Sequence, residues 1–256
     1  MLSRNTIKYI QSLQQKKFRQ MYNNFIVEGT KMTAEILRHA PFEVESIYAL
    51  GAWIDQNQPI LTSFQTITHE VSPKELDRIS GLKTPNQVLL VCKQPAQTLD
   101  LSTINHSLTL YLDELQNPGN MGSILRIADW FGIPYVFCSP ESVEQYNPKV
   151  IQASMGAFLR VKVVSMSFDQ LVEKVPDLPI LAAVLEGESV FSTTASAKGV
   201  LVIGNEGKGI SESIVQQATH LVSIPKAGNG GAESLYAAVA TGILCGVLLG
   251  GGGGNG

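Results

Sequence analysis

Apolar residues recur at regular intervals along the first part of the chain and predict short helices and strands. In residues 3–20, Ile7, Ile10 and Leu13 stand among Lys, Arg and Gln at a spacing close to the helical period, and Ser3 precedes them as a candidate N-cap. We therefore predict a basic amphipathic helix. The pattern then predicts strands at 25–27, 44–50, 64–68 and 87–93 and helices at 30–39 and 73–80.

A polar stretch separates this part from a second part with a different pattern. Residues 94–107 carry Pro95 and several Ser, Thr and Asn residues, a composition typical of a linker. From residue 108 onward apolar strands alternate with helices, which predicts an α/β domain with a largely parallel sheet covered on both faces. Between 156 and 179 we expect only an exposed segment. The predicted domains are 1–95 and 107–256, joined by a linker at 96–106.

Composition and charge narrow the class of protein. The 256 residues are 44% hydrophobic and 16% charged, which excludes disordered and fibrous chains. The net charge of -3 hides an asymmetry, because residues 1–40 hold seven basic and two acidic residues. A basic front end favours phosphate contacts there, with Lys16, Lys17 and Arg19 as candidates, although a solvated helix face explains the charge equally well.

Cysteine content and hydropathy exclude further classes. Three cysteines without a CxxC pair indicate neither a disulfide framework nor a zinc site, so we expect a cytoplasmic protein without a metal. The start of the chain lacks an apolar signal-like segment, and the longest nearly apolar run, 237–249, is too short to span a bilayer. We expect no membrane association.

Three polar, glycine-rich loops follow the most apolar strands of the second part. They are QNPGNMGS at 116–123, GNEGKG at 204–209 and PKAGNGGAES at 225–234. Ligands of open α/β sheets bind beyond the carboxyl ends of strands, and none of the three loops has the GxGxxG or GxxxxGK[ST] pattern of nucleotide-phosphate loops. Three side chains have two readings each: Arg126 as a surface cation or a site cation, Glu206 as a turn residue or a carboxylate directed into a cleft, and Ser234 as a helix cap or a site residue.

Taken together, these strings resemble the three ordered motifs of the SpoU (TrmH) family of RNA 2'-O-ribose methyltransferases. The matching segments are NMGSILRIA at 120–128, IGNEGKGI at 203–210, and IP with ESL within 224–235. The resemblance extends over 108–249. SLQQKKFRQ at 12–20 and FIVEGTK at 25–31 are similar to the small RNA-binding domain that often precedes this catalytic domain.

The resemblance implies a fold, a cofactor and a set of site residues. We expect a SPOUT-type parallel sheet with a deep trefoil knot, preceded by a small mixed α/β, L30e-like domain, and a homodimeric active site that uses S-adenosylmethionine. Carried over by position, the cofactor-binding residues are Leu185, Gly204, Ile224 and Leu235, and the residues around the reacting ribose are Asn120, Arg126, Glu206 and Ser234.

Arg126 is the residue that the resemblance implies as central to catalysis. Its guanidinium is always protonated and therefore a poor general base. Our hypothesis is that it binds the neighbouring phosphate and stabilises negative charge on the 2'-oxygen, while the proton leaves to another group or to water.

The sequence departs from the family pattern in its third motif. The motif usually reads Ser-Leu-Asn, and Tyr236 stands here in place of Asn. The loop 226–233 is about two residues longer than is usual in the family. The final helix should stop near Leu249, because glycines follow and destabilise a helix.

The leading hypothesis is an RNA ribose 2'-O-methyltransferase acting on ribosomal RNA, with transfer RNA second. The rivals are an RNA-binding protein of the same fold impaired by Tyr236, and a nucleotide-binding α/β enzyme unrelated to RNA.

Overall fold

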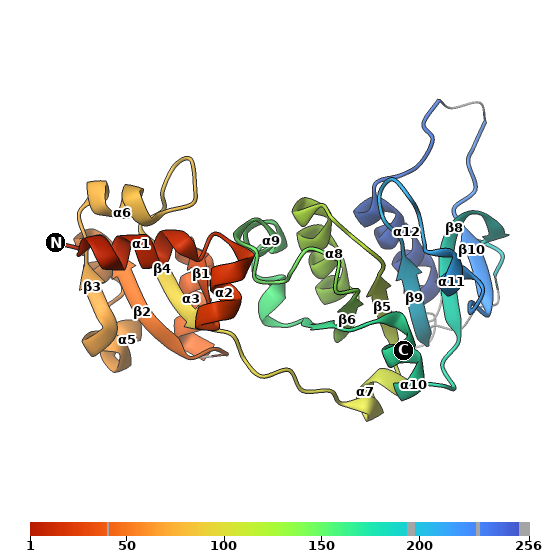
Figure 1. The fold of residues 1–256 in the computed structure, drawn as a ribbon, viewed down its shortest axis with the longest axis horizontal. Coiled ribbons are helices and arrows are strands. Elements are labelled where there is room, and N and C mark those ends of the chain that lie inside the picture. Colours follow the sequence, from red (N-terminus) through yellow and green to blue (C-terminus); the bar gives the residue numbers. More distant parts are fainter. Residues whose placement is uncertain (40, 194–197, 229–230, 251–256) are drawn as a thin grey trace. The chain divides into compact units, whose positions relative to one another are not determined.

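The structure is a computed structural model that describes residues 1–39, 41–193, 198–228 and 231–250. The chain divides into two compact units, and Figure 1 draws the first in red to yellow except for its green segment 146–152. Unit 1 comprises residues 1–97 and takes in 146–152, and unit 2 comprises the remainder. Each unit has its own sheet. Within the described ranges, no helix is long and apolar enough to cross a membrane.

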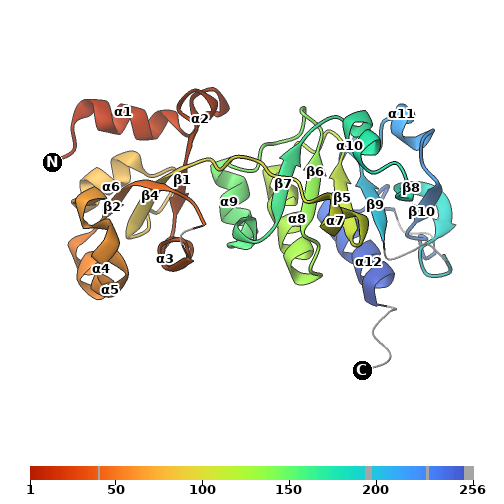
Figure 2. The same ribbon diagram turned by 90° about the horizontal axis from the view of Figure 1, so that it is seen from below.

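Unit 1 is built on a four-stranded mixed sheet in the order β1-β4-β2-β3, with β4 antiparallel to both of its neighbours. Alternate strand residues point to opposite faces, so each face packs against its own helices. Figure 2 shows α1 and α2 on one side of this sheet and α3, α4 and α5 on the other. The elements are α1 (Arg4–Ser12), α2 (Lys16–Tyr22), β1 (Asn24–Glu28), α3 (Thr30–His39), β2 (Val44–Ala49), α4 (Gly51–Gln56), α5 (Gln58–Leu61), the 3-10 helix η1 (Thr62–Ile67), β3 (Thr68–Glu70), α6 (Pro73–Ile79) and β4 (Val88–Lys93).

Two predicted elements of unit 1 need correction. The helix expected at 3–20 is two helices, α1 and α2, although Ser3 caps the first as predicted, its Oγ accepting from the Thr6 backbone nitrogen at 3.0 Å. The strand expected at 64–68 is mostly the 3-10 helix η1, and only Thr68 of it belongs to β3. The Thr68 Oγ1 donates to the Phe64 carbonyl at 2.8 Å, a local contact that holds the turn and that strand propensity does not detect.

Unit 2 contains a six-stranded sheet in the order β10-β8-β9-β5-β6-β7, and every pair in it is parallel. This confirms the expected α/β class and parallel sheet. Figure 2 shows α10 and α11 on one side of the sheet and α8 and α12 on the other. The remaining elements of the chain are α7 (Leu101–Asn105), β5 (Leu108–Leu112), α8 (Pro118–Trp130), β6 (Tyr135–Cys138), α9 (Pro148–Ser154), the 3-10 helix η2 (Ala157–Leu159), β7 (Lys162–Ser165), α10 (Phe168–Lys174), β8 (Ile180–Ser189), β9 (Gly199–Ile203), α11 (Glu212–Val215), β10 (His220–Ser223) and α12 (Ala237–Gly250).

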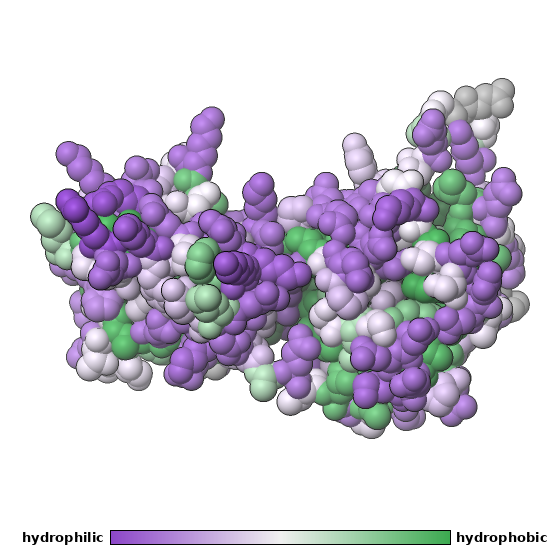
Figure 3. All heavy atoms as spheres, viewed as in Figure 1, coloured by the Kyte–Doolittle hydropathy of each residue, from purple (hydrophilic) through white to green (hydrophobic). Residues whose placement is uncertain are grey.

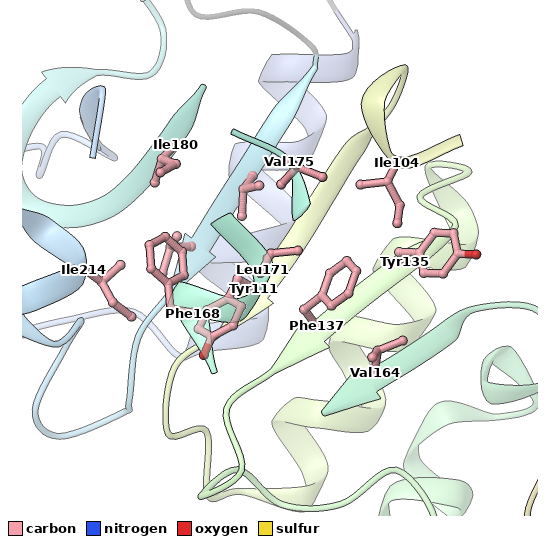
Figure 4. Packing of buried hydrophobic residues seen from close by; sticks show 12 residues of the cluster. Ile104, Tyr111, Tyr135, Phe137, Val164, Phe168, Leu171, Val175, Ile180 and Ile214 are labelled. Carbon is pink, nitrogen blue, oxygen red and sulfur yellow. The ribbon is translucent and has the colours of Figure 1, made fainter. Parts of the chain in front are cut away.

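The segment expected to be exposed between 156 and 179 is part of the core of unit 2, so that prediction was wrong. It forms the edge strand β7 and helix α10, whose Phe168 and Leu171 are buried. Figure 4 shows Phe168 beside Tyr111 of β5, and the two rings meet edge to face with centroids 5.0 Å apart. Phe168 and Leu171 lie three residues apart on one face of α10, so this short helix covers the sheet.

Helices α8 and α12 cover the other face and pack against each other. A Cβ at Gly242 or Gly246 of α12 would meet Ile127 or Phe131 of the α8 region at 3.6 and 3.8 Å, which is ordinary contact. α12 ends at Gly250, one residue beyond the predicted end.

Candidate active site

The loops after β5 and β9 meet because these strands are parallel neighbours in the sheet. Glu206, in the loop after β9, directs its carboxylate at the start of α8. It accepts hydrogen bonds from the backbone nitrogen of Asn117 at 3.1 Å, from that of Gln116 at 3.4 Å and from the Asn120 Nδ2 at 3.0 Å. The structure therefore brings together two predicted catalytic residues, Asn120 and Glu206.

These contacts explain the charge state of Glu206. Partial burial raises the pKa of the carboxyl group, but the hydrogen bonds from Asn120 and from backbone amides outweigh burial, and the net pKa is lowered. A carboxylate at the amino end of a helix also interacts favourably with the helix dipole. Glu206 is thus held ionised, as a hydrogen-bond acceptor that positions the start of α8.

The start of α8 has its own cap. Asn117 is the N-cap, and its Oδ1 accepts from the backbone nitrogens of Gly119 at 2.8 Å and Asn120 at 3.3 Å. Pro118 occupies the first helical position, where its missing N–H costs nothing. The Asn-Pro pair is a helix-start signal in the sequence, and it identifies Asn117 as a positioning residue that the motif comparison missed.

The loop after β9 is folded around Asn205, a second residue that sequence reasoning missed. Its Oδ1 accepts from the backbone nitrogens of Gly207 at 2.9 Å and Lys208 at 3.0 Å, and its Nδ2 donates to the Glu114 carbonyl at 2.8 Å. The Lys208 ammonium lies 2.8 Å from the Glu114 carboxylate, which raises the pKa of Lys208. The two loops are therefore joined by both backbone and side-chain contacts.

Gly204 opens this loop where no side chain fits. A Cβ there would lie 2.3 Å from the Gly209 carbonyl carbon and 2.4 Å from the Ile210 nitrogen, both backbone atoms. The chain segments on either side of the loop consequently touch main chain to main chain. The close approach explains why glycine is required at the start of this loop.

The other expected cofactor residues lie toward the carboxyl ends of β8 and β10. Leu185 lies beyond Ala182, the last β8 residue paired with β9, and its side chain is 74% exposed. Ile224 directly follows β10, and Leu235 precedes α12 with 48% exposure. The exposed apolar side chains of Leu185, within β8, and Leu235 fit the uncharged part of a cofactor such as S-adenosylmethionine.

Arg126 and Ser234 are exposed. Arg126 lies on α8, C-terminal to the turn that Asn117 caps. Within the described residues, no hydrogen bond joins Arg126 or Ser234 to Glu206 or to its partners. Because α12 begins at Ala237, Ser234 lies three residues before the helix and is not its cap. Tyr236, the departure from the family pattern, is 78% exposed at the entry to α12.

The predicted RNA-binding residues of α2 divide into two groups. Lys16 and Lys17 are exposed, as a phosphate contact requires. Arg19 is 1% exposed, and its Nη1 donates to the Leu13 carbonyl at 2.6 Å. A buried guanidinium cannot reach RNA, so the prediction for Arg19 is corrected: it joins α2 to the end of α1.

Comparison with known proteins follows the same division of the chain. Residues 107–246 match the SpoU rRNA Methylase family, and residues 4–90 match the MRM3-like substrate binding domain. The chain is 25% identical over 241 residues to the 23S rRNA (guanosine(2553)-2'-O)-methyltransferase RlmP of Bacillus subtilis, covering 93% of both.

Solved structures agree over nearly the whole chain. A protein of Porphyromonas gingivalis assigned to the TrmH family of RNA methyltransferases is 34% identical with a TM-score of 0.83, covering 97% of this chain and 98% of that one. An AdoMet-bound rRNA methyltransferase of Sinorhizobium meliloti, 24% identical, has the same fold with a TM-score of 0.84, covering 97% of this chain and 95% of that one.

Fold, loops and sequence matches define an RNA methyltransferase with a substrate-binding domain in front of its catalytic domain. The chain belongs to the SpoU rRNA methylase family. It is an RNA 2'-O-methyltransferase that uses S-adenosylmethionine, which confirms the activity and cofactor expected from the three motifs.

Proposed function

We propose that this methyltransferase modifies a ribose 2'-hydroxyl of bacterial ribosomal RNA. The observation that carries the proposal is the contact of Glu206 with Asn120 and the start of α8, which joins two of the three motifs. The choice of ribosomal over transfer RNA is supported by relatives named as 23S rRNA methyltransferases, among them RlmP of Bacillus subtilis and RlmB of Pasteurella multocida, which is 27% identical over 233 residues.

Arg126 has the chemistry that the reaction needs at the ribose. Bound S-adenosylmethionine supplies an electrophilic methyl group. The exposed guanidinium of Arg126 binds the phosphate next to the reacting ribose and stabilises the charge that develops on the 2'-oxygen. A permanent cation cannot take the hydroxyl proton, which leaves to water or to another group.

The other site residues hold and shape the pocket. Glu206 fixes the Asn120 side chain and the first turn of α8, and Arg126 lies further along the same helix. Gly204, Leu185, Ile224 and Leu235 line the cofactor, and Ser234 faces the ribose. We further propose that the trefoil knot and the homodimer of the family complete this site. We also propose that the chain has two functional domains, 1–95 and 107–256, joined by a linker at 96–106.

Labelled methyl transfer tests the proposal. The full chain and labelled S-adenosylmethionine are added to ribosomal and transfer RNA fractions from a bacterial strain whose own copy of the gene is deleted, and the nucleosides are analysed after digestion. We expect a labelled 2'-O-methylnucleoside in the ribosomal fraction. Label in transfer RNA alone overturns the choice of substrate. No transfer despite cofactor binding favours an RNA-binding protein impaired by Tyr236, and restoration of transfer by Tyr236→Asn confirms that cause.

A further inference from the structure

Unit 1 contains a cavity of about 690 Å³ between α3 and α4 that the methyl-transfer site does not use. Both helices begin where the parallel strands β1 and β2 end, and β4 lies between these strands. The carboxyl ends of strands are where open α/β sheets bind ligands. We call this cavity the α3–α4 groove. Figure 2 shows its two helices on the side of the sheet away from α1 and α2.

One wall of the α3–α4 groove is a charged face of α3. Lys31, Ala34, Glu35 and Arg38 recur at intervals of three and four residues, so they share one face of the helix. His39 ends the same helix and also lines the groove. Lys31 and Arg38 are exposed at this wall, and Glu35 is its single acidic residue. The wall therefore favours an anionic ligand.

The opposite wall and the floor carry amides over an apolar base. Trp53 and Ala34 are 2% and 8% exposed and form the floor. Gln56 of α4 and Gln87, just before β4, are exposed at the rim. Amide side chains offer both donors and acceptors, which suits the edge of a nucleobase better than a second charge does.

The size and charge of the groove agree with a polar organic ligand. Figure 3 draws the opposite face of unit 1, which carries α1 and α2, and hydrophilic side chains cover most of that face. The groove volume exceeds what a single inorganic ion needs and lies in the range of small-molecule sites. Cations on one wall and amides on the other match the two polar parts of a nucleotide.

We infer that the α3–α4 groove holds one unstacked nucleotide of the RNA substrate, with its phosphate at Lys31 and Arg38 and its base edge at Gln56 and Gln87. Single-stranded RNA is recognised through bases turned out of the stack, in this manner of phosphate and edge contacts. The inference rests on the proposed function and adds a second RNA contact surface to the exposed lysines of α2. Unit 1 would then recognise one nucleotide by specific contacts, in addition to attracting RNA through its positive charge.

Tryptophan fluorescence tests occupancy of the groove directly. The chain has two tryptophans, so Trp130→Phe leaves Trp53 in the groove floor as the only reporter. Trp130 is 84% exposed in unit 2 and does not line the groove. We expect rRNA fragments that the protein methylates to change Trp53 emission saturably. If Trp53 emission does not change when RNA is added, the inference is overturned, and no variant of the groove is needed for that test.

Charge reversal then connects the signal to the groove. Lys31→Glu/Arg38→Glu should weaken RNA binding by about tenfold or more and remove the emission change. The matched control is Lys74→Glu/Lys83→Glu, the same charge change at exposed positions of unit 1 outside the groove, and it should keep the emission change. A thermal melt shows whether each variant folds, and Lys31→Gln/Arg38→Gln replaces the reversal if it does not.

The remaining outcomes separate the alternatives. RNA affinity that depends on Lys16 and Lys17 alone, with a silent Trp53, overturns the groove in favour of α2. An emission change with 5'-mononucleotides but not with RNA overturns the RNA assignment and makes the groove a free-nucleotide site. Methyl transfer measured on the same samples keeps the two ideas apart: transfer with a silent groove refutes only the groove, whereas a groove that binds RNA without any transfer counts against only the proposed function.

Discussion

Glu206→Gln is the substitution that most directly tests how the candidate site is held together. Glutamine keeps the shape and one acceptor oxygen, so it can still accept from Asn117 and Asn120. It loses the charge, and its amide nitrogen cannot accept the third bond, at 3.4 Å from Gln116. The substitution therefore isolates the part of the contact that depends on ionisation.

The structure sets the size of the effect. A hydrogen bond to a charged group is worth about 1 kcal/mol more than a neutral one, which gives roughly 2 kcal/mol for the two retained bonds. Glu206 is exposed, and solvent screening reduces such contacts, so we expect a loss of about 1–2 kcal/mol in the unfolding free energy of unit 2. For a unit of this size the loss lowers Tm by roughly 2–6 °C.

The effect should depend on pH with a defined sign. Because the folded pKa of Glu206 is lowered from 4.5, its contribution is present above the unfolded pKa and is lost as pH falls through the folded pKa. The difference between wild type and Glu206→Gln should therefore be full at pH 7 and shrink below about pH 4.5.

Calorimetry at a series of pH values measures this difference, and added S-adenosylmethionine identifies the transition of unit 2 by raising its Tm. Glu173→Gln is the matched control, because Glu173 is exposed on α10 in the same unit. Equal melting of the two variants at pH 7, or a difference that persists unchanged in acid, would refute the positioning role. Unchanged stability with lost methyl transfer would instead place the carboxylate in direct contact with the substrate.

Three further predictions concern other parts of the chain. Arg126→Ala should lower turnover by about a hundredfold or more, which is the range found when one group that stabilises transition-state charge is removed. Calorimetric titration should show unchanged affinity for S-adenosylmethionine. A loss of that affinity as large as the loss of turnover would contradict the assignment of Arg126 to the ribose. Gly204→Ala forces main-chain atoms apart, so we expect a loss of about 1–3 kcal/mol in thermal melts and weaker cofactor binding, whereas Gly207→Ala, whose Cβ would meet only a side-chain oxygen at 3.6 Å, should be tolerated. Arg19→Met should destabilise unit 1 by about 1–3 kcal/mol in denaturant titrations, and Lys16→Met should instead leave stability unchanged and reduce the salt dependence of RNA binding.

The order of elements could be predicted from the sequence where burial leaves a clear pattern. Helix α3 begins and ends at the predicted residues, and the central strand β5 is buried along its whole length, as its continuous apolar run indicates. The edge strand β7 carries exposed Lys162 and Ser165 around two valines, so its sequence resembles a solvent-exposed loop. The predicted RNA-binding role of Arg19 was wrong because the sequence shows its charge but not the Leu13 carbonyl to which it donates a hydrogen bond.

Of the predicted site residues, Asn120 and Glu206 are brought together by the structure, and their contacts could not be predicted from the sequence. Motif order placed Asn120 and Glu206 on loops after strands, yet no local pattern says which strands are neighbours. The sheet places β9 next to β5 although about 90 residues separate them in the chain. The backbone donors of Gln116 and Asn117 were equally hidden, because a backbone N–H has no signature in the sequence.

The pairing of β5 with β9 has a consequence for synthesis. At roughly 5–20 residues per second, the ribosome completes β9 about 5–20 s after β5, so the central strand of unit 2 waits without one of its two neighbours while most of the sheet is still being made. Unit 1 has all four of its strands by Lys93, and it waits only for the later segment 146–152. During translation, the sheet of the substrate-binding domain is therefore complete before the sheet that carries the candidate active site.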